Sequence, residues 1–299
     1  MGDITNYAIP FFAVTLLLEL GISIYGKRKY YTNKDTWASL IMGVGSIGTT
    51  LLMKGFKFGI FTVLYSFKVV DIPMVGWGLV VLLLADDFTA YWVHRTSHRV
   101  RYFWASHVVH HSSTHYNLST ALRQTWTGEL SGSFWFYAWM PLVGFPPIWI
   151  LTAGSVSLLY QYWIHTEAIK TLPAPIEFIL NTPSHHRVHH SRDVKYLDKN
   201  YGAILIVWDR IFGTFIKEKE HPEYGLVENI DTYNPIRIAF AEWGVIFKDV
   251  WNAPGFFTKL KYVFAPPGYS HDGSRKTTDQ LQEEARQAVK ASRNKSDTP

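Results

Sequence analysis

The chain has 299 residues, of which 47% are hydrophobic and 16% aromatic, and its formal net charge is +5. It contains no cysteine, which excludes disulfide bonds and thiolate metal ligands. The basic residues form no single arm that would indicate nucleic-acid binding, so we expect no nucleic-acid partner. Several of them, such as Lys27, Arg28 and Lys29, stand beside apolar segments, which is typical of loops that face an anionic membrane surface.

Two apolar segments near the N-terminus indicate membrane-spanning helices. Residues 9–25 carry a single charge, Glu19, and a helix of this length, at about 1.5 Å per residue, is just long enough to cross a bilayer. A carboxylate inside a membrane indicates either a functional site or a pairing with another helix. Residues 37–53 form the second segment, in which Gly43, Ser46 and Gly48 offer small surfaces that let other membrane helices approach closely.

A third span is predicted over residues 75–93, and it contains the adjacent acids Asp86 and Asp87. Two acids in an apolar helix are costly unless they have partners. Asp87 precedes His94 by seven residues, so both lie on one stripe of the helix. We therefore expect Asp87 to accept the second ring N–H of a metal-bound histidine.

A fourth apolar segment covers residues 130–164 and is interrupted by Pro146 and Pro147. Because proline breaks a helix, the segment predicts a helical hairpin with its turn at this point. The second arm ends in Gln161 and His165, which stand four residues apart and therefore share a helix face. His165 is a candidate metal ligand on this ground.

Eight further histidines stand in three clusters at helical spacing. They are His94 and His98, then His107, His110 and His111, then His186, His189 and His190. One metal ion needs only three or four protein ligands, so the clusters together with His165 predict two metals in a shared cage. Imidazole suits iron, zinc, copper and nickel, which leaves the metal open. A membrane protein that binds zinc for hydrolysis or transport is the alternative from another class.

Beyond residue 170 the chain is polar, and we expect no further span. We predict an all-α, polytopic integral membrane helical bundle of about four spans, with a cytoplasmic, histidine-rich helical cap that holds a di-metal site. The expected regions are an N-terminal transmembrane region (1–85), a catalytic region (86–216), a C-terminal cytoplasmic cap (217–267) and a polar tail (268–299) that is a frayed helix or disordered. With no retrieval signal visible, we expect a bacterial inner membrane, or the endoplasmic reticulum if the source is eukaryotic.

The motifs HRTSH, HVVHH and HRVHH, with QYWIH between the second and third, resemble the membrane fatty-acid hydroxylase and sterol desaturase superfamily. The resemblance covers roughly residues 86–215. Within it, YNLSTALRQ, LLYQYWIHTE, NTPSHHRVHH, DKNYG and WDRIFGTF are most similar to the alkylglycerol monooxygenase branch, which cleaves the ether bond of alkylglycerols.

The resemblance implies a di-iron centre whose ligands map onto the nine histidines named above, with no catalytic residue beyond them. Gln161 stands where relatives place a histidine or asparagine near the metal. Asn117, close to the second box, is a candidate partner of the ligands, as is Asp87. His185 directly precedes the third box and is not expected to bind.

The implied reaction is activation of O2, hydrogen abstraction from the carbon next to the ether oxygen, and hydroxylation to a hemiacetal. The hemiacetal collapses to a fatty aldehyde and a glycerol derivative. This branch takes electrons from tetrahydrobiopterin, and its animal members carry a Glu directly after the second histidine of the first box, where this chain has Arg99. The alternative within the superfamily is a sterol or fatty-acyl hydroxylase or desaturase that uses a separate ferredoxin or cytochrome.

Overall fold

The computed structural model describes residues 4–296, so residues 1–3 and 297–299, the outer ends of the predicted N-terminal region and tail, lie outside the described residues. Within 4–296 the chain forms thirteen α-helices, two short 3-10 helices and no strand beyond two isolated bridges. The predicted all-α class is confirmed.

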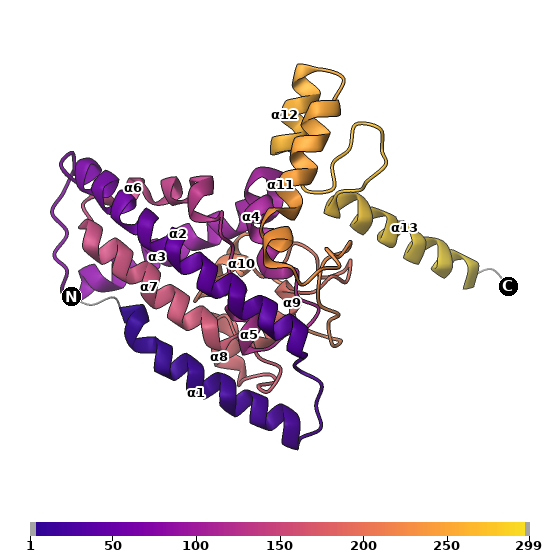
Figure 1. The fold of residues 1–299 in the computed structure, drawn as a ribbon, viewed down its shortest axis with the longest axis horizontal. Helices are drawn as coiled ribbons and strands as arrows, with labels where there is room; N and C mark the ends of the chain where they lie inside the picture. The colour runs from indigo at the N-terminus through magenta and orange to yellow at the C-terminus, as the bar shows by residue number, and fades with distance from the viewer. Residues whose placement is uncertain (1–3, 297–299) are drawn as a thin grey trace.

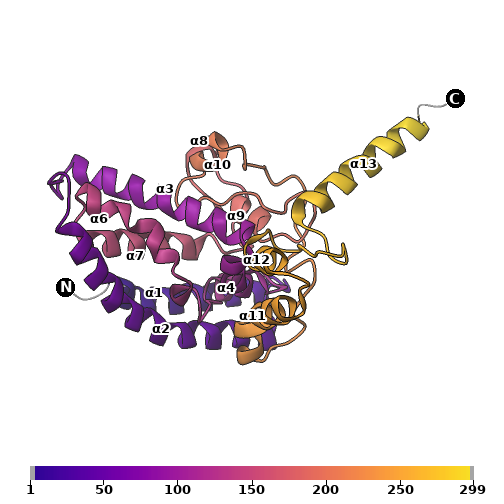
Figure 2. The same ribbon diagram turned by 90° about the horizontal axis from the view of Figure 1, so that it is seen from above.

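Four long helices form a bundle, and the histidine-rich elements lie at one end of it (Figures 1 and 2). They are α1 (Ile4–Tyr25), α2 (Asn33–Tyr65), α3 (Trp77–Arg99) and α7 (Pro147–Trp163). Helix α7 packs against the other three. The shorter helices are α4 (Arg101–His111), α5 (Leu118–Ala121), η1 (Glu129–Ser131), η2 (Ser133–Tyr137), α6 (Trp139–Val143), α8 (Ala174–Ile179), α9 (Pro183–His189), α10 (Val207–Ile211), α11 (Pro235–Asn252), α12 (Phe256–Phe264) and α13 (Thr278–Ser296).

Two of the long helices, α1 over Ala8–Tyr25 and α2 over Asn33–Tyr65, are long and apolar enough to cross a membrane. Helix α7 has only 17 residues, and α3 carries Asp86 and Asp87 in its middle. The predicted number of about four spans is therefore not confirmed. The two apolar helices are in keeping with a membrane protein.

The predicted hairpin over residues 130–164 is correct at its turn but not in its first arm. Helix α7 begins at Pro147, directly after the extended Pro146, as proline at the first helical position favours. The first arm is broken into η1, η2 and α6 because Gly132 takes a left-handed conformation with φ of 80°.

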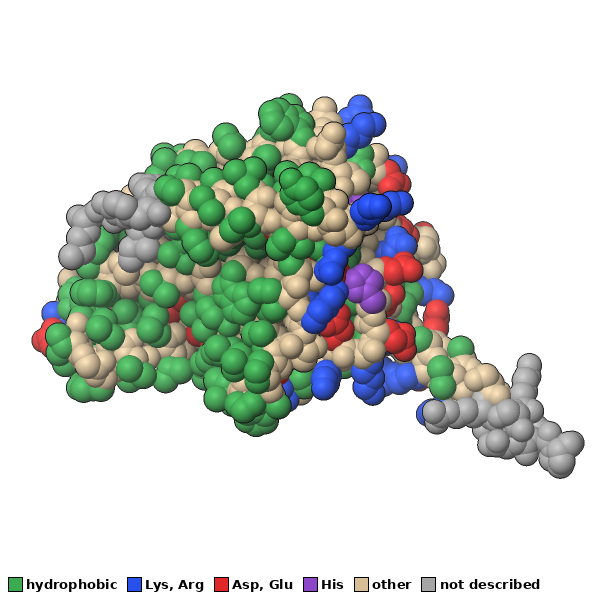
Figure 3. All heavy atoms as spheres, turned by 90° about the horizontal axis from the view of Figure 1, so that it is seen from below, with side chains coloured by type: hydrophobic (Ala, Val, Ile, Leu, Met, Phe, Trp, Pro, Cys, Tyr) green, Lys and Arg blue, Asp and Glu red, His purple; other side chains and the backbone are tan. Residues whose placement is uncertain are grey.

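Side chains on the surface separate by type along the bundle. In the view of Figure 3, hydrophobic side chains cover most of the bundle, whereas Lys, Arg, Asp and Glu gather at the end toward the C-terminus. Large apolar residues on α1 and α2 are exposed, with Leu17 64% and Leu52 72% accessible. Inside, α2 meets the short α5 segment so closely that a Cβ on Gly43 would lie 2.6 Å from the carbonyl oxygen of Leu122. This close approach is the role predicted for Gly43, whereas a Cβ on Gly48 would meet no atom within 4 Å, so the same prediction is not confirmed there.

The C-terminal third is helical and covers the histidine-rich end. Helices α11 and α12 pack on each other and on α4. The predicted polar tail contains the helix α13, which projects away from the rest of the molecule (Figure 1). Its first turns are held because Arg99 binds Asp279 at 2.9 Å and the side-chain amide of Gln282 donates to the carbonyl oxygen of Leu197 at 3.0 Å. Disorder, one of the two expectations for residues 268–299, does not describe this part.

Candidate metal centre

Three helices and the end of a fourth deliver the nine histidines to one place. Helix α3 ends where Val100 is extended, with φ −123° and ψ 115°, and α4 starts directly after it and packs back against α3. This reversal brings the first two histidine boxes together. Helix α9, which starts at Pro183, supplies the third box, and His165 follows the last turn of α7.

The nine histidines separate into two clusters, each with its ligand atoms within 4.8 Å of one another. The first cluster contains His94, His98, His107, His111 and His189. The second cluster contains His110, His165, His186 and His190. All nine predicted ligands are thus brought together, in two groups that could each hold a metal ion.

Each HxxHH box contributes to both clusters. In α4, His107 and His111 belong to the first cluster, whereas His110 belongs to the second. The division follows from helix geometry, because side chains four residues apart share a face and the intervening position points about 60° to 100° away from it. The third box divides in the opposite sense, since only its middle histidine, His189, lies in the first cluster. Two helices therefore link the clusters rigidly.

Distances between ring nitrogens fit metal ligation. In the first cluster the Nε2 atom of His107 lies 3.0 Å from that of His94 and 3.1 Å from that of His111. In the second, the Nε2 atom of His186 lies 3.0 Å from that of His165 and 3.2 Å from that of His190. Imidazole nitrogens bind ions such as zinc at about 2.0–2.1 Å, so neighbouring ligand nitrogens on one ion lie about 3 Å apart.

Hydrogen bonds to the main chain select the tautomer that ligation needs. The Nδ1–H groups of three histidines donate to carbonyl oxygens: His94 to Tyr201 at 2.8 Å, His165 to Gln161 at 2.7 Å, and His189 to Lys199 at 2.9 Å. Their Nε2 atoms then carry the lone pair that faces the cluster. Within residues 4–296, the buried Nε2 atoms of His98 and His189 have no hydrogen-bond partner, which a bound metal would supply.

The electrostatic setting keeps the imidazoles neutral. Burial, followed by repulsion from neighbouring histidines, lowers the pKa well below its usual range for all six histidines of the two HxxHH boxes. These are His107, His110, His111, His186, His189 and His190. Neutral imidazole is the form that binds a metal.

The predicted partners of the ligands have other contacts. Asp87 accepts hydrogen bonds from the main-chain N–H of Ile204 at 2.7 Å and from the indole of Trp208 at 2.9 Å, so it holds the segment after α9 and does not orient a histidine. The side chain of Gln161 donates to Ser157, and only its carbonyl oxygen orients a histidine. Asp87 thus contacts no histidine through these bonds, contrary to the expectation, whereas Gln161 lies beside the ligands as expected but contacts His165 through its main chain.

Asn117 and Glu19 hold the backbone around the site. Asn117 caps α5 and donates to the carbonyl oxygen of Tyr30 at 2.7 Å. Glu19 of α1 is buried and accepts hydrogen bonds from Tyr31, from Thr166 next to His165, and from the main-chain N–H of Leu118. Of the two roles considered for Glu19, pairing with other elements is the one found.

The carboxylate that does approach a histidine is Asp198, which sequence reasoning did not single out. Its side chain lies 3.4 Å from the Nδ1 atom of His98 and 3.0 Å from Arg99. Main-chain carbonyls of Lys199 and Tyr201, from the same loop, orient two more histidines. These three residues belong to the DKNYG motif at 198–202, which the sequence comparison had singled out. The spacing within the motif does not by itself predict a contact with a histidine. His185, as expected, lies outside both clusters and pairs with Glu177 at 3.0 Å.

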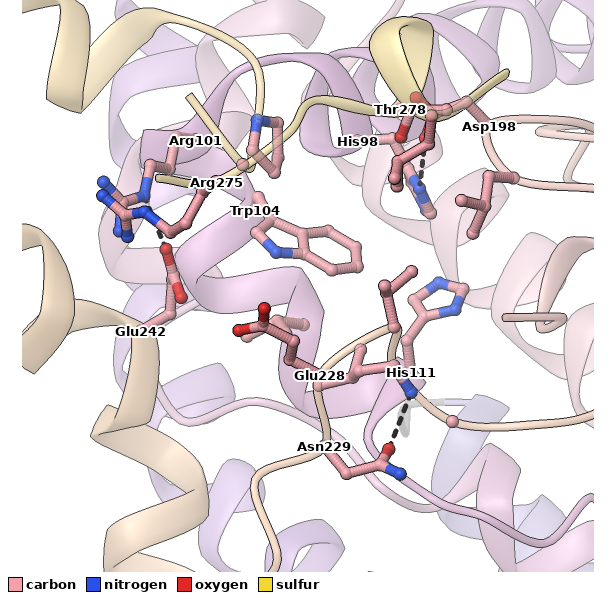
Figure 4. A pocket seen from close by; sticks show the side chains of 18 of the residues that line it. His98, Arg101, Trp104, His111, Asp198, Glu228, Asn229, Glu242, Arg275 and Thr278 are labelled. Carbon is pink, nitrogen blue, oxygen red and sulfur yellow. Dashed lines mark hydrogen bonds and ion pairs between the residues drawn. The ribbon is translucent and has the colours of Figure 1, made fainter. Parts of the chain in front are cut away.

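A pocket of about 390 Å³ opens beside the first cluster. His98, His111 and His189 line one end of it (Figure 4). Figure 4 shows Trp104 between these histidines and the charged side chains on the far side. That charged group contains Arg101, Glu242 and Arg275, and the remaining wall combines apolar side chains with further charged ones at Asp198, Glu228 and Lys276. The first cluster is thus the one that this pocket reaches.

Comparison with known proteins agrees with this geometry. Residues 79–214 match the family model for fatty acid hydroxylase. The chain is 41% identical over 271 residues to alkylglycerol monooxygenase of Homo sapiens and 38% identical over 269 residues to that of Xenopus tropicalis, in both cases over 89% of this chain and 60% of the relative. It is 26% identical over 232 residues to the ornithine lipid hydroxylase OlsE of Rhizobium tropici, which covers 74% of this chain and 61% of that protein.

The chain therefore spans about three-fifths of the length of the alkylglycerol monooxygenases that it matches. No solved structure matches it significantly. The matched region contains all nine clustered histidines. Residues 79–214 are thus identified as a fatty acid hydroxylase domain, within a chain that is similar over most of its length to the alkylglycerol monooxygenases.

Proposed function

We propose that this chain is a membrane di-iron monooxygenase that uses O2 to hydroxylate a lipid C–H bond. The favoured substrate is an alkylglycerol, hydroxylated at the carbon next to its ether oxygen to yield a fatty aldehyde and a glycerol derivative. The proposed ligands are the nine histidines of the two clusters. The active site would face the cytoplasm from a multi-pass membrane protein.

The observation that carries the proposal is the division of nine imidazoles into two adjoining clusters that share both HxxHH boxes. Within residues 4–296, neither cluster includes a carboxylate, which differs from soluble di-iron bundles that rely on Glu and Glu-x-x-His. A hydrolytic zinc site needs only three ligands and one metal, so nine histidines in two clusters favour the di-metal proposal over the zinc alternative. Two irons, when bound, would supply the oxidising power that an unactivated C–H bond requires.

The residues of the site have distinct tasks in this proposal. The main-chain carbonyls of Gln161, Lys199 and Tyr201 hold the ring orientation of three ligands, and Asp198 does so for a fourth, His98. The pocket beside the first cluster gives a lipid a route to the histidines. Its apolar wall suits a chain, while its charged side suits the polar end of the lipid.

The electron donor is also part of the proposal. The similarity to alkylglycerol monooxygenases supports reduced tetrahydrobiopterin. Arg99 is engaged by Asp198 and Asp279, so it does not stand free at the position where animal members carry Glu. We therefore keep a separate redox protein as the second possibility for the donor, with O2 as co-substrate in either case.

The test uses purified protein in mild detergent with iron, O2, reduced tetrahydrobiopterin and an alkylglycerol. We expect fatty aldehyde to form with O2 consumption and the His186→Ala variant to lose this activity, because His186 lies in the second cluster. Full activity in the variant would refute the site assignment. Aldehyde formation that persists without O2 would refute the monooxygenase proposal.

A sterol or fatty-acyl substrate is the alternative, and the more distant similarity to an ornithine lipid hydroxylase supports only the broader possibility of a lipid other than an alkylglycerol. If iron is present but no alkylglycerol is converted with pterin, the same protein should be supplied with ferredoxin and its reductase. Hydroxylated or desaturated acyl lipid or sterol would then establish the alternative. Zinc retained in place of iron, with activity indifferent to O2, would establish the non-redox class.

A further inference from the structure

Helices α11 and α12 carry an exposed apolar surface that their place in the polar half of the sequence does not predict. On α11 the exposed residues recur at helical spacing, and on α12 they continue it. We call this surface the hairpin face; it consists of Ile236, Phe240, Phe247, Trp251, Phe256, Phe257, Leu260 and Phe264. Trp251 is 74% and Phe257 78% accessible, so the largest side chains are the most exposed.

The opposite side of the same two helices forms their packing surface. Ile238, Ala239 and Ile246 of α11 are buried, as is Tyr262 of α12. Helix α11 packs on α4 and α2, and α12 packs on α4. One side of α11 and α12 therefore packs against the rest of the protein, and the hairpin face on the other side is free to contact an external partner.

Charged residues on α11 and α12 also divide between the two sides, with the acids facing the protein and the basic residues exposed. Both acids point inward, where Glu242 binds Arg101 at 2.6 Å and Asp249 binds it at 2.7 Å. The exposed or partly exposed charges that remain are basic, and among the described residues none of them forms an ion pair. They are Arg237, Lys248, Lys259 and Lys261. A basic helix pair with exposed Phe and Trp complements an anionic lipid surface.

The hairpin face is continuous with a candidate membrane helix. Helix α11 contacts α2, which is long and apolar enough to span a membrane. A small pocket of about 230 Å³ lies where α11 meets α4 and η1, with Phe240, Trp243 and Leu130 among its lining residues, and Leu130 is itself 55% exposed. Helix α2 thus contacts both α11 and η1, and the exposed Leu130 of η1 shares a pocket with Phe240 of the hairpin face.

We propose that the hairpin face lies in the interfacial layer of the membrane, with its Phe and Trp rings among the lipid chains and its basic residues at anionic headgroups. This gives the chain a membrane contact outside its apolar N-terminal segments. Because Ala241 and Val245 of α11 line the pocket beside the first cluster, the same helix separates the bilayer from that pocket. The proposal stands independently of the reaction assigned above.

The absence of cysteine from the sequence makes the test direct, because single cysteines can carry a spin label without background. The variants are Trp251→Cys and Phe257→Cys on the hairpin face, Leu52→Cys on α2 as the lipid-facing reference, and Ala288→Cys on α13 as the exposed polar reference. Each labelled full-length protein is placed, one copy per disc, in nanodiscs of phosphatidylcholine and phosphatidylglycerol. Label accessibility to lipid-soluble oxygen and to a water-soluble nickel chelate is then measured.

We expect labels at 251 and 257 to show an oxygen-to-nickel accessibility ratio several-fold above that at 288 and similar to that at 52. Ratios equal to that at 288 would overturn the proposal. Dipolar broadening between labels at 251 or 257 in detergent, together with a ratio equal to that at 288 in the one-copy discs, would show instead that a second copy covers the face. Discs of phosphatidylcholine alone should lower the ratio at 251, and an unchanged ratio would remove the anionic-lipid part of the proposal. Unchanged metal content and thermal unfolding verify that each variant is folded.

Discussion

Asp198 lies 3.4 Å from the Nδ1 atom of His98, and it is the only carboxylate that contacts either histidine cluster in the part of the chain that the structure describes. The same side chain binds Arg99 at 3.0 Å, so the last turn of α3 holds both of its partners. Carboxylates in this position fix the orientation of a metal-binding imidazole and raise its basicity.

Replacing this carboxylate should weaken metal binding without removing a ligand. We expect Asp198→Asn to lower the metal affinity of the first cluster by about 10–100-fold, the range typical for such partners of metal ligands. Titration of metal-stripped protein measures the affinity. The control is Asp279→Asn, which removes the other partner of Arg99 but no contact to a histidine. Equal losses in both variants would mean that Asp198 acts only through Arg99.

The division of each HxxHH box between two clusters predicts unequal effects for neighbouring histidines. His107→Ala leaves four imidazoles in the first cluster, whereas His110→Ala leaves three in the second. Because three ligands hold an ion more weakly than four, we expect His110→Ala to lower the metal content per chain more than His107→Ala does. Metal analysis of the purified proteins, with the exposed His221→Ala as control, decides the matter. Identical losses would argue against separate clusters.

A buried ion pair supports the start of α2 and the loop after α5. Arg123 lies 3.1 Å from Asp35, and both side chains are almost fully buried. Removing one partner leaves an uncompensated charge, so Arg123→Met should lower the free energy of unfolding by about 3–5 kcal/mol. Denaturant titration in mild detergent measures this.

The exposed pair Arg192–Glu223 provides the matched comparison for that experiment. Arg192→Met should cost less than about 1 kcal/mol, because surface ion pairs are screened by solvent. The double variant Asp35→Leu with Arg123→Met should recover part of the loss. If it were no more stable than Arg123→Met, the cost would come from lost packing of the arginine.

Glu177 predicts a pH dependence of stability outside the metal ligands. Burial opposes its ionisation, but hydrogen bonds from His185 and Ser184 outweigh burial, and the pKa of Glu177 falls to about 2 from an ordinary value of 4.5. Because the folded pKa lies below the unfolded one, the stabilisation is complete above about pH 4.5 and is lost as the pH falls toward 2.

The Glu177→Gln variant should therefore be less stable than the parent at pH 7, by about 1–3 kcal/mol, the usual cost of losing hydrogen bonds to a charged group. The difference should shrink between pH 4.5 and pH 3. Unfolding curves of both proteins across this range measure it. A difference that stayed constant would show that the ionised carboxylate is not what stabilises this corner.

The sequence by itself determined those features of the site that depend on local geometry. Spacings of three and four residues in HRTSH and in the two HxxHH boxes place side chains on neighbouring helix faces whatever surrounds them, so eight of the nine clustered histidines could be predicted from spacing. His165 was predicted from its place at the end of an apolar helix, four residues after Gln161. The apolar segments over residues 9–25 and 37–53 likewise predicted α1 and α2, because their composition allows little else.

Only the tertiary structure decided which histidine joins which cluster and what orients it. The partners come from a loop whose backbone is irregular, with φ of 57° at Asp198 and 56° at Asn200. Asn200 holds this loop by donating from its side chain to the carbonyl oxygens of His185 and Ile216. Such left-handed residues follow from long-range packing and leave no periodic signal in the sequence. The expectation that Asp87 orients a histidine failed for a related reason. Helix periodicity places Asp87 and His94 on one stripe of α3, but the segment that packs against this stripe supplies the N–H groups of Ile204 and Trp208 as donors instead.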